Sequence, residues 1–238
     1  MKQHNSFIKG ITDGLPICFG YLSVAFAFGI FAVGSGLGIF QTLLISMTNV
    51  TSAGQLAGVP IIAAGGTLLE LAASQLVINL RYALMSISLS QKLGPTVRLA
   101  DRFLIAFVNT DEVFAVASSK NGTVGRNYMF GLILTPFLGW SVGTLAGAVA
   151  GDILPPVVTS SLGVAIYAMF CAIVIPETKK SRATALCALT AIALGCAFHF
   201  IPFLSTVPDG FVIIICAVVA SAIFALVSPV DQEVADNE

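Results

Sequence analysis

Long apolar stretches dominate the chain and indicate its helices. From Gly14 to Leu69, 56 consecutive residues include no Asp, Glu, Lys, Arg or His. Four further stretches lack Asp, Glu, Lys and Arg and hold 25, 24, 26 and 21 residues: 127–151, 153–176, 183–208 and 210–230. Because a helix needs about 20 apolar residues to cross the hydrocarbon, each of the four is long enough for one span, and 14–69 for two. The alternating segments of about ten residues that are typical of a transmembrane barrel are missing. The pattern predicts an all-α, polytopic transmembrane helical bundle.

The basic residues predict how the chain crosses the membrane. Lys and Arg gather at the N-terminus, 92–102, 120–126 and 179–182, and short basic loops lie in the cytoplasm. This places the N-terminus in the cytoplasm, requires 103–119 to enter and return on that side, and leaves 38–57 to dip in from outside. We expect full spans near 15–34, 59–90, 127–150, 161–177, 183–201 and 210–228. Eight conventional helices are the alternative, so we predict about six to eight membrane segments, some broken or re-entrant.

Composition narrows the class of protein. Hydrophobic residues make up 57% of the chain and charged residues 10%, with a mean hydropathy of +0.96. These values exclude a soluble enzyme, and the net charge of −1 offers no basic field for nucleic acid. We expect one transmembrane domain over 1–230 and an acidic, solvated tail over 231–238.

We expect neither a cofactor nor a metal site. The five cysteines are scattered through apolar runs, and the two histidines are His4 and His199, so the usual His/Cys zinc site cannot be built. No Gly-rich loop is followed by Lys-Ser/Thr, so the chain is not its own ATPase. Transport would have to use a gradient or a partner.

Four charged residues lie in apolar surroundings: Glu70, Arg81, Asp111 and Glu112. A charge at the bilayer centre costs about 2.5–3.5 kcal/mol on insertion scales, so each requires a reason. On one helix Glu70 and Arg81 share a face but stand roughly 16 Å apart. Arg81 therefore needs another counter-charge, and Asp111 or Glu112 is nearest in the sequence. The alternative is that these groups are interfacial or pair only to hold the bundle together.

Two further features concern the backbone. Residues 48–55 (Thr-Asn-Val-Thr-Ser-Ala-Gly-Gln) are small or polar. They predict a broken helix whose ends can bind a carboxylate or an ammonium, or else a plain extracellular loop. Glycines at every fourth position form a ridge that lets another helix approach closely, within this chain or in another subunit: Gly139, Gly143, Gly147 and Gly151.

The chain also contains a candidate internal repeat. Pro16 with Gly20 and Tyr21 resembles Pro136 with Gly139 and Trp140, at an offset near half the chain. Transporters are often built from repeated halves.

Four stretches of the first half form a recognisable set. They are Asp13-Gly14-Leu15-Pro16 with Gly20-Tyr21 and Ala25–Gly29, then Ser52–Gln55, Ile78–Met85 with its Asn-x-Arg, and Thr110–Phe114 with its Asp-Glu pair. Together they resemble the AzlC family of branched-chain amino acid exporters. The resemblance implies the large subunit of a two-component exporter, with a small AzlD-like membrane protein as partner. It implies leucine, isoleucine, valine and their analogues as substrates, and a bacterial cytoplasmic membrane as location. Tyr82 stands where the family usually has His, and Met85 replaces an aromatic residue.

With this resemblance, the intramembrane polar residues are the candidate substrate site. Arg81 would take the carboxylate of the amino acid, and Asp111 or Glu112 the ammonium. Gln55 and Asn79 would supply directional hydrogen bonds, while Tyr21, Phe28 and Phe107 would form apolar walls. Asp111, Glu112 or Glu70 would carry a coupling proton.

Two other classes of function remain open. One class is an intramembrane protease. An aspartyl protease needs two carboxylates that converge from different helices, whereas Asp111 and Glu112 are adjacent. A serine protease would need a Ser paired with His199. A passive channel or an assembly scaffold would suit the glycine ridge but would leave the buried charges without a use.

Overall fold

The structure is a bundle of helices. A computed structural model of the chain describes residues 5–155, 157–158, 171, 174–176, 178–179 and 181–227. The helices are α1 (Phe7–Gly34), α2 (Ile39–Thr48), α3 (Ala53–Ala63), α4 (Leu68–Lys92), α5 (Leu99–Phe107), α6 (Asp111–Ser118), α7 (Arg126–Ile153), α9 (Arg182–Phe200) and α10 (Asp209–Val227), with a 3-10 turn at Leu204–Thr206. Within these residues no strand occurs, which confirms the predicted all-α class.

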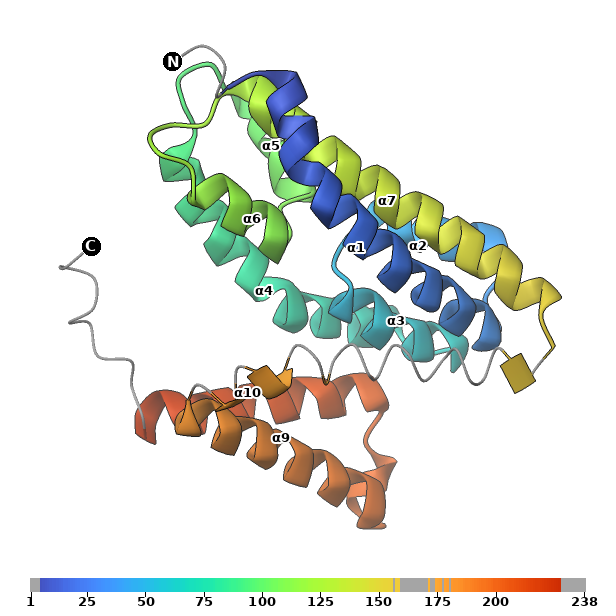
Figure 1. The fold of residues 1–238 in the computed structure, drawn as a ribbon. Helices are drawn as coiled ribbons and strands as arrows, with labels where there is room; N and C mark the ends of the chain where they lie inside the picture. The colour runs from blue at the N-terminus through green and yellow to red at the C-terminus, as the bar shows by residue number, and fades with distance from the viewer. Residues whose placement is uncertain are drawn as a thin grey trace.

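The central contact joins α1 and α7, which lie side by side along their whole length (Figure 1). A Cβ on Gly139 would lie 2.5 Å from the Cys18 carbonyl oxygen, and one on Gly143 would lie 2.5 Å from that of Leu22. The glycine ridge of α7 therefore packs against α1 of the same chain. Positions advance together along both helices, so the two helices run parallel.

Glycines of α1 complete the contact. A Cβ on Gly10 would lie 2.1 Å from the Tyr128 carbonyl oxygen, and one on Gly29 would lie 2.4 Å from that of Thr144. Both helices have bare backbone where they meet, and the resulting close approach increases their dispersion contacts.

The parallel direction of α1 and α7 fixes the path between them. The end of α4 lies beside the start of α7, because Gly94 N–H donates to the Val124 carbonyl at 2.9 Å. The start of α7 lies beside that of α1, because Gly125 N–H donates to Asn5 Oδ1 at 2.8 Å. Thus α4 runs back against α1, and the segments α2–α3 and α5–α6 each leave and return to the same end.

The two returning segments are pairs of short helices. The predicted hairpin at 103–119 is α5 and α6, separated by Val108–Thr110, and the predicted polar interruption after Thr48 separates α2 from α3. We call the end with Lys9, Lys92, Arg98, Lys120 and Arg126 the basic end.

The expected span at 59–90 was wrong in its boundary. The helix that begins at Ala53 ends at Ala63, and α4 begins at Leu68. Gly65 adopts a φ of 69°, which favours glycine and stops a helix. Thr67 then caps α4, its Oγ1 accepting the Glu70 N–H at 3.2 Å. The first span also starts earlier than predicted, at Phe7 rather than residue 15, after the cap Ser6.

Five helices of the described residues are long and apolar enough to cross a membrane: Phe7–Gly34, Leu68–Lys92, Arg126–Ile153, Arg182–Phe200 and Gly210–Val227. They correspond to five of the six expected spans. The sixth, 161–177, lies almost wholly outside the described residues, and the tail at 231–238 lies outside them as well. Helix α10 packs on α3 and α4, and α9 packs on α10.

The close α1–α7 contact predicts that a single added methyl group lowers the stability of the protein. A Cβ on Gly147 would lie 2.0 Å from the Phe26 carbonyl oxygen, so Gly147→Ala must push the helices apart. We expect the melting temperature of the purified protein in detergent to fall by about 5 °C or more. The control is Gly195→Ala, because a Cβ there meets nothing within 4 Å. Equal melting temperatures for the two variants would contradict the packing described.

Candidate functional site: a cavity between two helix breaks

A cavity of about 840 Å³ lies where the two helix breaks approach α1, α4 and α7. The break before α3 contributes Val50, Thr51 and Ser52, and the break before α6 contributes Thr110. The rest of the wall comes from α1, α4, α7, the starts of α3 and α6, and one residue after α7, Val174: Pro16, Ile17, Gly20, Tyr21, Val24, Ala53, Ile78, Arg81, Tyr82, Asp111, Glu112, Trp140 and Val174. This volume is within the range of small-molecule sites.

Arg81 and Asp111 form an ion pair on the cavity wall. Nη1 of Arg81 lies 2.9 Å from Oδ2 of Asp111, and both side chains are about half exposed, at 50% and 46%. The predicted pairing of Arg81 with a carboxylate of 111–112 is therefore confirmed. Because the pair is only half covered, a solute in the cavity can reach both groups.

Tyr82 holds the Arg81 side chain. Its hydroxyl accepts a hydrogen bond from Arg81 Nη2 at 3.0 Å and donates to the Thr51 carbonyl at 3.3 Å. The guanidinium carbon also lies 4.8 Å from the centre of the Tyr82 ring. Tyr82 thus links the cation of α4 to the break before α3.

Glu112 faces a different partner from its neighbour Asp111. The Tyr21 hydroxyl donates to Oε2 of Glu112, and the Tyr21 ring meets Trp140 edge-on, with centroids 5.2 Å apart. Among the described residues, Glu112 makes no salt bridge. With one cation and two carboxylates, the wall carries an excess of negative charge when all three are ionised.

Gln55 and Asn79, predicted to contact substrate, do not line the cavity. Gln55 is 1% exposed; its Nε2 donates to Ser46 Oγ at 2.9 Å, and its Oε1 accepts the Ser52 N–H at 3.3 Å. Ser46 Oγ lies 2.7 Å from Thr144 Oγ1. Gln55 therefore ties the break to α7.

Asn79 belongs to a second part of this polar network. Its Nδ2 donates to Gln75 Oε1 at 3.1 Å, which also accepts from Asn49 Nδ2 at 3.1 Å. Gln75 Nε2 donates to the Gly54 carbonyl at 2.8 Å. These bonds satisfy polar groups of a broken backbone that lipid could not satisfy.

Three other predicted residues lie away from the cavity wall. The buried Glu70 accepts a hydrogen bond from Gly210 N–H at 2.9 Å and so joins α4 to α10. Phe28 is 1% exposed in an apolar cluster with Ala32, Leu37 and Val59, while the ring of Phe107 lies 6.5 Å from that of Phe137.

The break before α3 contains strained backbone. Ser52 adopts a φ of 52°, the only positive φ of a non-glycine residue in the described part of the chain. Ser52 and Ala53, the start of α3, both line the cavity. A helix N-terminus carries partial positive charge and free N–H groups, so this wall favours a carboxylate.

Sequence reasoning missed several wall residues, of which Trp140 and Tyr82 matter most. The sequence signal for Trp140 was that it is the residue equivalent to Tyr21 in the candidate repeat. The parallel packing of α1 and α7 brings these two rings into contact. The signal for Tyr82 was its place next to the intramembrane Arg81. Trp and Tyr are common at membrane interfaces, so the residue type alone did not mark either position as part of a site.

The comparisons with known proteins concern the same region. The family model described as AzlC protein matches residues 16–154, a range that includes every wall residue except Val174. The chain is 30% identical to the inner membrane protein YgaZ of Escherichia coli, covering 79% of this chain and 78% of that protein. It is 32% identical to an uncharacterized membrane protein of Archaeoglobus fulgidus, covering 84% and 88% respectively. No solved structure gives a significant match.

The buried position of Gln55 yields a prediction that separates support of the break from substrate contact. Gln55→Leu leaves the Ser52 N–H without its acceptor and leaves Ser46 Oγ bonded to Thr144 alone, which costs about 1–3 kcal/mol. We expect a melting temperature lower by about 5 °C. The control Gln91→Leu, at an exposed site, should change it little. If both variants melt alike, the network does not hold the break.

Proposed function

Because the chain belongs to the AzlC protein family, we propose that this membrane protein exports branched-chain amino acids from the bacterial cytoplasm. The observation that carries the proposal is the half-exposed Arg81–Asp111 pair beside Glu112, in a cavity whose other walls are mostly apolar. A zwitterion with an apolar side chain matches each of these features.

Each charged end of the substrate is assigned to groups of opposite charge on the cavity wall. The carboxylate is bound by Arg81 and the start of α3, where the guanidinium and the helix N-terminus both favour a negative charge. The ammonium is bound by Glu112, which lacks a cationic partner among the described residues, with Asp111 adjacent. Tyr21 positions Glu112 by its hydrogen bond.

The branched side chain is assigned to the apolar wall. Val24 and Ile78 supply aliphatic surface, and Trp140 closes the cavity behind Tyr21. Such contacts distinguish substrates by size rather than by charge, so leucine, isoleucine and valine would share the site.

A packed layer separates the cavity from the basic end. It includes Val113, Ala117 and Tyr128, all with no measurable exposure. Beyond them Asp13 pairs with Lys120 and with Lys9, each at 2.7 Å. If the basic end faces the cytoplasm, as its positive charge favours, this layer has to open for a cytoplasmic substrate to enter.

The proposal also includes a coupling proton, which follows from the site, and a partner, which follows from the family resemblance. Asp111 or Glu112 carries a coupling proton, since a carboxylate that contacts the substrate can exchange one on release. A small AzlD-like membrane protein completes the exporter, and the N-terminus lies in the cytoplasm.

The test measures valine, leucine and isoleucine remaining in cells loaded with dipeptides that release them. Cells expressing this chain with an AzlD-like partner should lose these amino acids faster than cells expressing either protein alone. No change for any of the three, with both proteins inserted in the membrane, would contradict the proposed substrates.

Single substitutions test the charged site. Arg81→Gln and Asp111→Asn should each lower the export rate about tenfold or more, because each removes a charge-assisted contact. Arg182→Gln, at the exposed start of α9, is the matched control and should export normally. Normal export by the two site variants at equal membrane levels would refute the site.

A wall substitution tests the assignment of the apolar side chain. Val24→Phe narrows the cavity and should reduce export of leucine about tenfold, with a smaller loss for valine. Val142→Phe on the outer surface of α7, where Val142 is 54% exposed, is the control. An equal loss for every amino acid would place the side chain elsewhere.

A further inference from the structure

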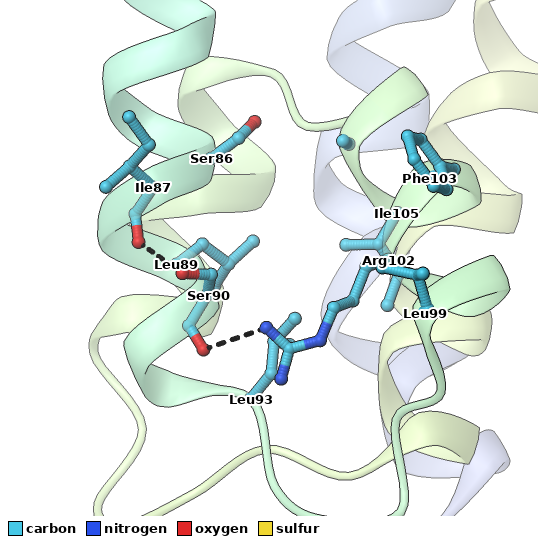
Figure 2. A pocket seen from close by; sticks show the side chains of 10 residues that line it. Ser86, Ile87, Leu89, Ser90, Leu93, Leu99, Arg102, Phe103 and Ile105 are labelled. Atoms are coloured by element: carbon cyan, nitrogen blue, oxygen red, sulfur yellow. Dashed lines mark hydrogen bonds between the residues drawn. The ribbon is translucent and has the colours of Figure 1, made fainter.

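A second, smaller cavity of about 270 Å³ lies between α4 and α5, away from the site described above. Figure 2 shows Arg102 reaching across this groove from α5 toward the end of α4. Its other walls are apolar apart from two serines: Ser86, Ile87, Leu89, Ser90, Leu93, Leu99, Phe103, Ile105 and Ala106.

We propose that this groove binds an anionic phospholipid of the leaflet at the basic end, with Arg102 holding the headgroup phosphate and an acyl chain lying along the groove. Nothing in the transport function requires this site, so it stands independently of the proposed export.

The charge of Arg102 supports an anionic headgroup. No carboxylate of the described residues forms a salt bridge with it. Among the described residues its guanidinium makes a single hydrogen bond, from Nη1 to the Ser90 carbonyl, and this bond is long at 3.5 Å. The nearest acid in sequence, Asp101, is already bound to Arg126 at 2.9 Å. The guanidinium therefore retains donors for a phosphate, which it matches in geometry.

The neighbouring cations add to the attraction. Arg98 belongs to the same basic segment between α4 and α5, and the described residues include no salt bridge to it. Lys92, at the end of α4, donates instead to the Ser118 carbonyl of α6. Basic pockets between membrane helices on the cytoplasmic side are known to bind anionic headgroups.

The groove's surroundings support a lipid rather than a free anion. Ile87, Leu99 and Phe103 line it and are 62%, 72% and 71% exposed. The cavity thus continues onto an apolar outer surface of the bundle. The Ser90 hydroxyl donates to the Ile87 carbonyl at 2.6 Å, so this hydroxyl does not need a hydrogen-bond acceptor on the ligand. A phosphate with an attached acyl chain satisfies both the cation and the apolar walls.

The test titrates the purified protein in detergent with phosphatidylglycerol and with phosphatidylcholine and counts bound lipid by native mass spectrometry. We expect phosphatidylglycerol to bind about tenfold more tightly, and Arg102→Gln to remove most of that difference. The control Arg182→Gln removes an exposed cation that does not line this groove, and this variant should keep the preference for phosphatidylglycerol.

A second variant tests the apolar part. Ala106→Phe fills the groove while keeping Arg102, and should weaken phosphatidylglycerol binding several-fold. Inorganic phosphate alone should not compete. Equal binding of the two lipids, equal losses for Arg102→Gln and Arg182→Gln, or full competition by inorganic phosphate would each overturn the proposal.

Discussion

The close, parallel packing of α1 on α7 is the contact on which the rest of the bundle depends. Lipid tails are as apolar as leucine, so two membrane helices gain little from hydrophobic burial and associate where backbones can approach. Glycines on both helices permit that approach here, as at Gly10 and Gly147. Because the two helices run parallel, an odd number of crossings must lie between them. Here α4 is that crossing, and the segments α2–α3 and α5–α6 each turn back to the end from which they left.

The two returning segments, α2–α3 and α5–α6, each contain a helix break, and these breaks form part of the cavity wall. A helix that breaks inside a membrane exposes polar backbone that lipid cannot satisfy. At the break before α3, Gln55 of α3 accepts the Ser52 N–H and Gln75 of α4 donates to the Gly54 carbonyl. Gln55 in turn donates to Ser46 of α2. The break before α6 is tied to α4 by Asn109, whose Nδ2 donates to Ser86 Oγ at 3.1 Å. The cavity lies where the two breaks meet.

This arrangement divides the intramembrane polar residues into two groups. One group, with Gln55, Asn79 and Glu70, bonds other parts of the protein and holds helices together. The other, with Arg81, Asp111 and Glu112, lines the cavity. Gln55 and Glu70 are 1% and 5% exposed, whereas the side chains of Arg81 and Asp111 are about half exposed.

The sequence by itself determined the helical class, the five candidate spans of the described residues, the glycine ridge and the need of Arg81 for a carboxylate. Each follows from local quantities: the length of an apolar run, the spacing of glycines and the cost of a charge in lipid. It did not determine the break at Gly65, because apolar residues flank it on both sides. Only the tertiary structure decided that α1 is the partner of the ridge. It likewise decided that Gln55 supports the break while Trp140 and Tyr82 form the wall. The physical reason is that a polar side chain at membrane depth needs a partner, and the sequence does not show whether the fold supplies one or leaves the group free for a ligand.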